Sequence, residues 1–208
     1  MNWSDAERSS SCALILLAAG SSSRMGSAKQ LLDYQGKPLI RHAVEIALQT
    51  KCEAVVVVLG ANAEKIRKSL SGIAAGRKIF EVVENPRWKE GMGASIQAGV
   101  RAVELLGCGG AILALADQPL ITPAILDRLL TEHERSGQPI VASQYAGTVG
   151  VPVFFAKSHF PQLLALAPDQ GCKGVIQKNG DAVSRIDCPE AAADVDTPLD
   201  YDALRRTG

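Results

Sequence analysis

Short apolar runs alternate along this chain with stretches of helical pattern, and that alternation restricts the possible folds more than any other feature of the sequence. Most of the runs are continuous, without a polar residue at every second position, and such strands are buried on both faces. Strand, helix and strand, repeated in this order, predict a parallel sheet with right-handed crossovers. We expect strands at residues 13–17, 54–59, 78–83 and 111–116, and helices at 38–49, 63–70, 93–106 and 123–135.

The second part of the chain is less regular. Strands are expected at 139–143 and 151–155, short helices at 157–166 and 172–178, and a last helix from about Pro198. With 208 residues, 47% of them hydrophobic, the chain suffices for one substantial core but not for several full-sized domains. We therefore predict a single three-layer α/β domain over residues 1–208, with a mostly parallel central sheet. The polar segment 1–12 is expected to be a flexible N-terminus.

Charge balance and the length of the apolar runs exclude two classes of partner. The chain has 22 Lys and Arg against 22 Asp and Glu, so it lacks the basic excess with which proteins bind nucleic acid. Its longest uninterrupted apolar run, Cys12–Ala19, is far shorter than the roughly 20 residues that span a bilayer. Five scattered cysteines without a CxxC pair are typical of a reducing compartment. We expect a cytoplasmic protein with no nucleic-acid or membrane partner.

The loops after the strands are where a ligand is expected, because open α/β sheets bind ligands at the carboxyl ends of their strands. The loop after the first strand, Ala18–Gln30, is rich in glycine and serine and carries Arg24 and Lys29. Small residues allow the backbone to approach a ligand closely, and the two cations suit a polyphosphate. The spacing is neither that of a Walker A loop nor GxGxxG. The same residues also fit a flexible turn with two solvated cations.

Three further places carry polar residues near predicted element ends, and each has two interpretations. Asp117 directly follows the fourth apolar run, where a carboxylate either holds a divalent cation or begins the turn before Pro119. Ser95 lies near a helix start, so it either caps the helix or meets a ligand. Asp194 and Asp196 precede the last helix, as acids that favour a helix N-terminus or as a source of a second metal ligand.

Three motifs, in this order along the chain, resemble those of the MobA-like nucleotidyltransferases. They are LLAAGSSSRMGSAKQLL at the first strand, LADQP at the fourth and DVDTPLDY near the end, so the resemblance extends from about Leu14 to Tyr201. Within that family the chain is most similar to the molybdenum cofactor cytidylyltransferases, which the segments NPRWKEGMGASIQAGV and GVPVFFAKSHFPQLLAL also resemble. The run Ala18–Gly20 is similar to the cytidylyl type, whereas guanylyl relatives more often carry two glycines there.

The resemblance implies a Rossmann-like nucleotidyltransferase fold and a Mg²⁺-dependent enzyme. Such an enzyme transfers CMP from CTP to the phosphate of a molybdopterin-type acceptor, releases pyrophosphate, and serves a molybdoenzyme as client.

The resemblance also implies roles for individual residues. The nucleotide-binding group would be Ala18, Ala19, Gly20, Arg24, Lys29 and Ser95, with Ser95 near the base and the two cations on the triphosphate. The catalytic group would be Arg24, Lys29 and Asp117, and the Mg²⁺ ligands would be Asp117 and Asp196.

At two places the chain departs from this pattern. It has Val151 where such proteins commonly have the histidine of Gly-His-Pro, and Lys173 where they often have an arginine. Two other functions stay open: cytidylyl transfer to a sugar or isoprenoid phosphate, and a non-catalytic nucleotide-binding module that delivers the cofactor to a molybdoenzyme.

Overall fold

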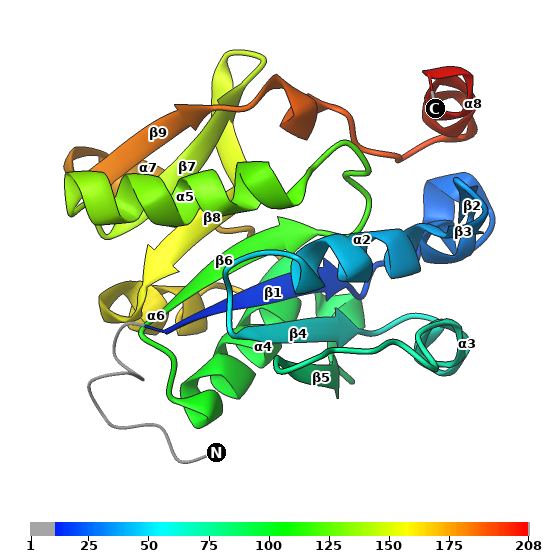
Figure 1. Cartoon of the computed structure of the whole chain (residues 1–208), viewed down its shortest axis with the longest axis horizontal. Coiled ribbons are helices and arrows are strands. Elements are labelled where there is room, and N and C mark those ends of the chain that lie inside the picture. Colours follow the sequence, from blue (N-terminus) through cyan, green and yellow to red (C-terminus); the bar gives the residue numbers. More distant parts are fainter. Residues whose placement is uncertain (1–10, 208) are drawn as a thin grey trace.

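The structure is a computed structural model that describes residues 11–207. Its centre is a seven-stranded sheet in the order β5-β4-β1-β6-β8-β7-β9, with helices on both faces (Figure 1). The predicted three-layer α/β architecture with a mostly parallel sheet is confirmed. The strands of the sheet are β1 (Cys12–Ala18), β4 (Ala54–Leu59), β5 (Ile79–Glu84), β6 (Gly110–Leu115), β7 (Ile140–Tyr145), β8 (Thr148–Ala156) and β9 (Val183–Asp187).

The expected flexible N-terminus, residues 1–12, falls mostly outside the described residues. Its last two residues, Ser11 and Cys12, are described, and both are buried. Strand β1 begins at Cys12, whose backbone N–H donates to the Glu53 carboxylate at 2.7 Å. The expectation was therefore wrong for these two residues, because the first strand of the sheet already includes the end of the polar segment.

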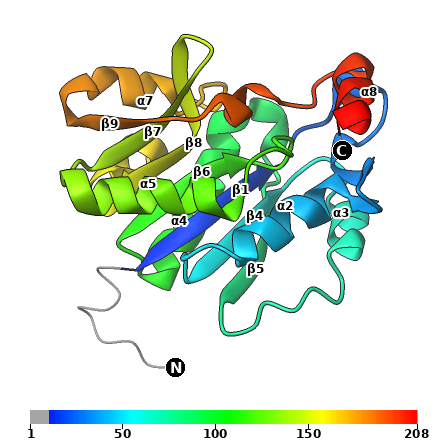
Figure 2. The same ribbon diagram turned by 45° about the horizontal axis from the view of Figure 1, so that its top comes forward.

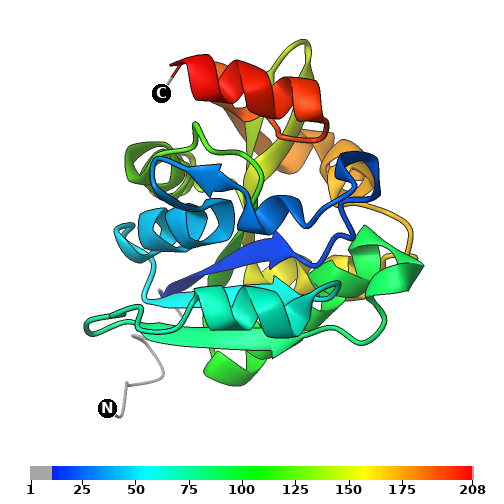
Figure 3. The same ribbon diagram turned by 90° about the vertical axis from the view of Figure 1, so that its right-hand side faces the viewer.

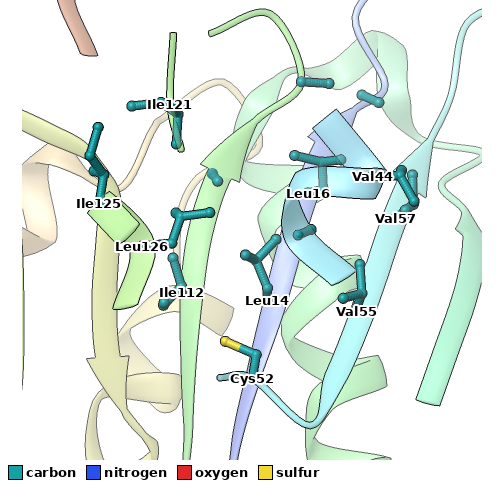
Figure 4. Packing of buried hydrophobic residues seen from close by; sticks show 14 of the residues in the cluster. Leu14, Leu16, Val44, Cys52, Val55, Val57, Ile112, Ile121, Ile125 and Leu126 are labelled. Carbon is teal, nitrogen blue, oxygen red and sulfur yellow. The ribbon is translucent and has the colours of Figure 1, made fainter. Parts of the chain in front are cut away.

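Strand β1 lies inside the sheet, between β4 and β6, and contributes side chains to two hydrophobic cores. Its side chains alternate between the faces: Leu14 and Leu16 belong to one core, and Ala13, Ile15 and Leu17 to the other. Figure 4 shows Leu14 and Leu16 packed among side chains of the neighbouring strands. Because both faces are covered, neither set of alternate positions can be polar, which explains the continuous apolar runs in the sequence.

Six helices cover the two faces of the sheet (Figure 2). On one face lie α2 (Leu39–Leu48), α3 (Ala63–Ser69) and α5 (Pro123–Ser136). On the other lie α4 (Met92–Leu106), α6 (Phe160–Leu164) and α7 (Lys173–Lys178). The predicted helix 157–166 is instead a 3₁₀ turn, Lys157–His159, followed by the short α6. Among the described residues, no helix has the length and apolar character needed to cross a bilayer.

Two parts of the sheet differ in strand direction. Strands β5, β4, β1 and β6 are parallel neighbours, whereas β8 runs antiparallel to both β6 and β7. Strand β9, parallel to β7, and the small hairpin of β2 (Asp33–Tyr34) and β3 (Lys37–Pro38) were not predicted. Within β9 only Ile186 is buried, so this edge strand carries almost no hydrophobic signal.

The last helix, α8 (Pro198–Thr207), lies beside the β2–β3 hairpin. The Tyr201 hydroxyl donates to the Asp33 carbonyl oxygen at 2.7 Å. In Figure 1, α8 and the hairpin lie at the end of the sheet toward which β1 points, and in Figure 3 this end faces the viewer. The segment that leads into α8 therefore reaches the same edge as the loops that follow the parallel strands.

Helix α4 begins against the chain that follows α6, and Gly93 makes this possible. A Cβ atom at Gly93 would lie 2.2 Å from the Ala167 carbonyl oxygen and 2.8 Å from that of Gln170. Both contacts are with backbone, which cannot move aside as a flexible side chain can. Glycine at this position therefore sets the distance between α4 and the segment after α6.

We expect Gly93→Ala to lower the free energy of unfolding by about 1–3 kcal/mol, the usual cost of overpacking a tight site. The matched control is Gly174→Ala in α7, where a Cβ atom would meet nothing within 4 Å. That change should be neutral or stabilising by up to about 1 kcal/mol, because alanine is the better helix former. Urea unfolding of both variants measures the difference, and equal stabilities would contradict the packing argument.

Candidate active site

A cavity of about 470 Å³ opens at the carboxyl ends of β1 and β6. Its wall comes from four segments that are far apart in sequence: the loop after β1, the segment between β5 and α4, the end of β6, and the segment before α8. Every predicted site residue with a described side chain lines it: Ala18, Ala19, Gly20, Lys29, Ser95, Asp117 and Asp196. Arg24 lies in the 3₁₀ helix Ser23–Met25, but its side chain is outside the described part of the structure.

The loop after β1 is held in shape by Gln30. This side chain is buried, and its amide donates to the carbonyl oxygens of Ala18 at 3.2 Å and Gly20 at 2.8 Å. The Ser22 hydroxyl donates to the Gln30 amide oxygen at 3.2 Å and accepts from the backbone N–H of Lys29 at 3.1 Å. The loop is thus a closed hydrogen-bonded unit in the structure, which argues against the alternative of a loose glycine turn.

The Lys29 ammonium lies between two carboxylates. It donates to Oδ2 of Asp117 and, at 2.8 Å, to Oδ1 of Asp196. All three side chains are largely buried, with exposed fractions of 13% for Lys29, 17% for Asp117 and 32% for Asp196. Segments that follow β1, follow β6 and precede α8 therefore meet at one cation.

Burial and the neighbouring opposite charges shift the pKa values of Asp117 and Lys29 in opposite directions. Burial raises the pKa of Asp117, while the positive charge of Lys29 and its hydrogen bond counteract that rise. Burial by itself would lower the pKa of Lys29, but the two carboxylates outweigh it and the pKa is raised. Lys29 therefore carries its charge at neutral pH, and that charge compensates the buried carboxylates.

Asp117 and Asp196 form a donor set that suits a hard divalent cation. The second oxygen of Asp117, Oδ1, is buried and accepts no hydrogen bond from the described residues. Mg²⁺ is typically held by one or two carboxylates together with substrate phosphates. Within residues 11–207 no group of three or more His, Cys, Asp or Glu could hold a metal. The protein would thus supply these two carboxylates, and the substrate the other ligands.

The start of α8 decides between the two interpretations of the acidic residues before it. Asp200 accepts from the backbone N–H of Thr197 at 2.7 Å, and its own N–H donates to the Thr197 hydroxyl at 3.3 Å. This reciprocal pair is a capping box. Asp196 contributes its backbone N–H to the Asp200 carboxylate at 3.2 Å, while its own carboxylate faces Lys29. The capping acid is therefore Asp200, not Asp196.

The segment between β5 and α4 forms the opposite wall of the cavity. Ser95 is buried in the first turns of α4, whose N-cap is Gly91, so Ser95 is not the capping residue. Trp88 packs closely over Gly60, where a Cβ atom would lie 2.5 Å from the Trp88 Cβ atom and 2.7 Å from the Ala19 carbonyl oxygen. Lys89 places its ammonium 5.6 Å from the centre of the Trp88 ring.

Sequence reasoning missed three residues that shape the cavity: Gln30, Asn85 and Trp88. Gln30 and Trp88 line it directly, and Asn85 is buried beside Ser95. An asparagine before a proline is usual in a turn, and a single glutamine in a polar loop gives no pattern at all. Their roles come from contacts that depend on the folded shape of the loops, which periodicity does not reveal.

The cysteines offer no activated nucleophile. All five are free and buried. Burial raises the pKa of Cys172 to about 12, which leaves it almost entirely protonated at neutral pH. Cys172 is a packing residue of the core that contains Ala13, Ile15 and Leu17.

A second cavity, of about 520 Å³, lies over α6 and α7. Gln170, Gly171 and Lys173 line it, so part of one segment that departs from the family pattern faces this cavity. It adjoins the first one, since a Cβ atom at Gly171 would lie 3.4 Å from Sδ of Met92, which lines the first cavity. Val151, the other departure from the family pattern, lies half-buried in β8 and packs against the core that contains Ala13, Ile15 and Leu17.

Residues 14–183 match the family described as MobA-like NTP transferase domain. The chain is 29% identical over 203 residues to purine catabolism protein PucB of Bacillus subtilis (strain 168), covering 92% of this chain and 95% of that protein. It is 31% identical over 196 residues to nicotine blue oxidoreductase of Paenarthrobacter nicotinovorans, covering 88% and 91%. It is 24% identical over 187 residues to the molybdenum cofactor cytidylyltransferase of Escherichia coli (strain K12), covering 90% and 92%.

Solved structures agree with the architecture. Rv0371c from Mycobacterium tuberculosis H37Rv superposes with a TM-score of 0.77 at 28% identity, covering 95% of this chain and 99% of that one. Rv0371c in complex with manganese superposes with a TM-score of 0.72 at 26% identity, covering 96% and 100%. A CMP:2-keto-3-deoxy-manno-octonic acid synthetase complexed with CTP has a TM-score of 0.72 at 17% identity, covering 95% and 98%, a likeness of fold alone.

We expect Lys29→Met to destabilise the protein by about 3–5 kcal/mol at neutral pH, because it leaves a buried carboxylate without its partner. The loss should shrink as the pH falls. Without Lys29, burial and the negative charge of Asp196 both keep the folded-state pKa of Asp117 above the unfolded value of about 3.9. An acid with a raised folded pKa binds more protons when folded, so the stability of the variant falls as pH rises through that range.

The measurement is urea unfolding of the unaltered protein and of Lys29→Met between pH 5 and pH 8. The double variant Lys29→Met/Asp117→Asn is the control, because it has no carboxylate at position 117 to titrate and should lose that part of the pH dependence. A stability gap that stays constant over this range would show that Asp117 is not the titrating group.

Proposed function

The chain belongs to the MobA-like NTP transferase family and is a nucleotidyltransferase, and from this premise we propose that it transfers CMP from CTP to the phosphate of a molybdopterin-type acceptor. Pyrophosphate is the second product, and Mg²⁺ is the metal. The observation that carries the proposal is the Lys29 ammonium held between Asp117 and Asp196 at the wall of a cavity that the small residues of the loop after β1 also line. Cation, carboxylates and close backbone approach are what a metal-bound triphosphate requires.

In the proposed reaction an oxygen of the acceptor phosphate attacks the α-phosphorus of CTP. The bond from that oxygen to phosphorus forms, the bond between the α-phosphorus and the bridging oxygen breaks, and pyrophosphate leaves with the electron pair. Asp117 and Asp196 would hold a divalent cation, which would supply charge neutralisation at the phosphates. Lys29 and Arg24 donate to phosphate oxygens and offset the charge on the leaving pyrophosphate, so catalysis consists mainly of positioning and electrostatics.

The cytidylyl specificity is supported by the loop after β1. Ala18 and Ala19 stand there where guanylyl relatives more often have two glycines, and both line the cavity. The methyl group of Ala19 narrows the space beside the base, and a single pyrimidine ring fits a narrower slot than guanine. The Escherichia coli relative carries the same activity in its name.

The second cavity is the proposed place of the acceptor. It adjoins the nucleotide cavity at Met92 and Gly171, so an acceptor phosphate there is close to the nucleotide. Lys173 lines it and supplies a cation where relatives often have arginine. A lysine contacts phosphate as a point charge without the planar fork of arginine.

Two other activities are weighed against this one. Transfer to a sugar or isoprenoid phosphate would use the same nucleotide site with a different occupant of the second cavity. An oxidoreductase activity, such as the name of the Paenarthrobacter nicotinovorans relative describes, would need no pyrophosphate to leave. The ion pair of Lys29 with two carboxylates favours phosphoryl chemistry, and it also argues against a non-catalytic delivery module.

The deciding experiment measures pyrophosphate release from CTP with Mg²⁺ and molybdopterin, and Asp117→Asn should lower turnover by a factor of about 10² or more. Asparagine keeps the size of the side chain but removes the charge that binds the metal. Asp202→Asn, on the exposed surface of α8, is the control for loss of one carboxylate and should retain full activity. Pyrophosphate release with sugar or isoprenoid phosphates, but not with molybdopterin, would show that the acceptor is a different one. No pyrophosphate release with any of these acceptors would refute nucleotidyl transfer.

The same assay with all four nucleotides tests the base preference. We expect CTP to exceed GTP in transfer efficiency by at least about tenfold, which corresponds to 1.4 kcal/mol. Ala19→Gly should reduce that ratio, because the removed methyl group widens the slot, while the ion pair of Lys29 stays intact. A better turnover with GTP or ATP in the unaltered protein would contradict the cytidylyl assignment.

A further inference from the structure

We propose that Asn85 is a positioning residue for base selection: it turns the hydroxyl proton of Ser95 toward the cavity, where Ser95 donates to ring atom N3 of cytosine. This inference rests on the proposed function, since it concerns the nucleotide in the same cavity. The size of the slot beside Ala19 separates a pyrimidine from a purine. It does not separate cytosine from uracil, which have the same ring, so a polar contact has to do so.

The hydrogen bonds of Asn85 fix the orientation of its side-chain amide. Asn85 is buried directly after β5, and its backbone N–H donates to the Leu59 carbonyl oxygen at 2.8 Å. Its Oδ1 atom accepts from the backbone N–H of Arg87 at 3.0 Å, and its Nδ2 atom donates to the Ser95 hydroxyl oxygen at 3.0 Å. A backbone N–H can only donate, so Arg87 determines which end of the amide faces Ser95.

This orientation determines what Ser95 can offer to a ligand. A hydroxyl group has one proton and two lone pairs, and Asn85 already occupies one lone pair. Among the described residues, the bond from Asn85 is the one hydrogen bond of the Ser95 side chain. The Ser95 proton therefore points to another acceptor, and Ser95 lines the cavity in which the base would lie.

The two pyrimidines differ at the atom that such a donor would meet. Ring atom N3 of cytosine has a free lone pair and accepts a hydrogen bond, whereas N3 of uracil carries a proton and can only donate. A donor aimed at N3 thus satisfies cytosine and leaves two opposed donors with uracil. Sites that hydrogen-bond one substrate discriminate strongly against an analogue that leaves buried polar groups unpaired.

Asn85→Asp tests the role of the amide with almost no change of shape. One carboxylate oxygen still accepts from Arg87, but the other can only accept from Ser95, which turns the Ser95 proton away from the cavity. The dissociation constants of CTP and UTP, measured by calorimetry with Mg²⁺ and without acceptor, should shift so that the preference for CTP falls at least about tenfold. Both nucleotides carry the same triphosphate, so the added charge affects them equally and cancels in the ratio.

Ser95→Ala shows whether Asn85 acts through Ser95. Ser95→Ala alone should reduce the preference for CTP, and adding Asn85→Asp to it should change the ratio no further. If Asn85 had a purely structural role, its replacement would weaken the binding of both nucleotides without changing the ratio of their dissociation constants. An unchanged ratio in folded Asn85→Asp, or an equal effect of that change in the Ser95→Ala background, overturns the proposal. If Asn85→Asp fails to fold, an unchanged ratio in Ser95→Ala overturns it.

Inorganic triphosphate separates this inference from the proposed function. It has no base, so its affinity should be the same in the unaltered protein and in Ser95→Ala. If the unaltered protein bound neither CTP nor inorganic triphosphate, the proposed function would be overturned, and the role of Asn85 with it. Normal binding of both, with the CTP to UTP ratio unchanged in the variants, overturns the role of Asn85 alone.

Discussion

The ion pair of Lys29 with two carboxylates is the interaction on which the arrangement of this site depends. Its partners, Asp117 and Asp196, lie 88 and 167 residues further along the chain. Two carboxylates brought together at a largely buried place repel each other unless a cation lies between them. Three loops must therefore be held to a common point, and Lys29 supplies the compensating charge there.

Separate hydrogen bonds hold each of those three loops. Gln30 closes the loop after β1, and the carbonyl oxygen of Asp117 accepts from the backbone N–H of Val195 at 2.9 Å. The capping box of Thr197 and Asp200 fixes the start of α8, and the Asp196 carboxylate faces Lys29. These supports lie at the end of a strand, β1, that is packed on both faces, so the candidate site stands directly above both hydrophobic cores.

The sequence was informative where one residue type repeats along a buried element. Continuous apolar runs predicted the parallel strands, and the rule that ligands bind at their carboxyl ends located the loops that form the cavity. It was silent where a contact depends on how a loop folds: the Gln30 amide bonds carbonyl oxygens of its own loop, and the Asn85 amide bonds the Ser95 hydroxyl, ten residues further on. Strand β9 escaped notice because only Ile186 of it is buried. The prediction for Arg24 stays a prediction, because its side chain lies outside the described structure.

Selection of the base and selection of the acceptor are mechanically linked in this fold. The start of α4 carries Ser95, and its glycines Gly91 and Gly93 lie directly against the backbone of residues 167–170. That backbone continues into Gly171 and Lys173, which line the second cavity. The two cavities thus meet across close backbone contacts, whereas Lys29, Asp117 and Asp196 lie on separate loops. Because function resides in the site and not in the fold, we expect substitutions at the junction of α4 with residues 167–173 to alter the choice of substrate while the Lys29 ion pair stays in place.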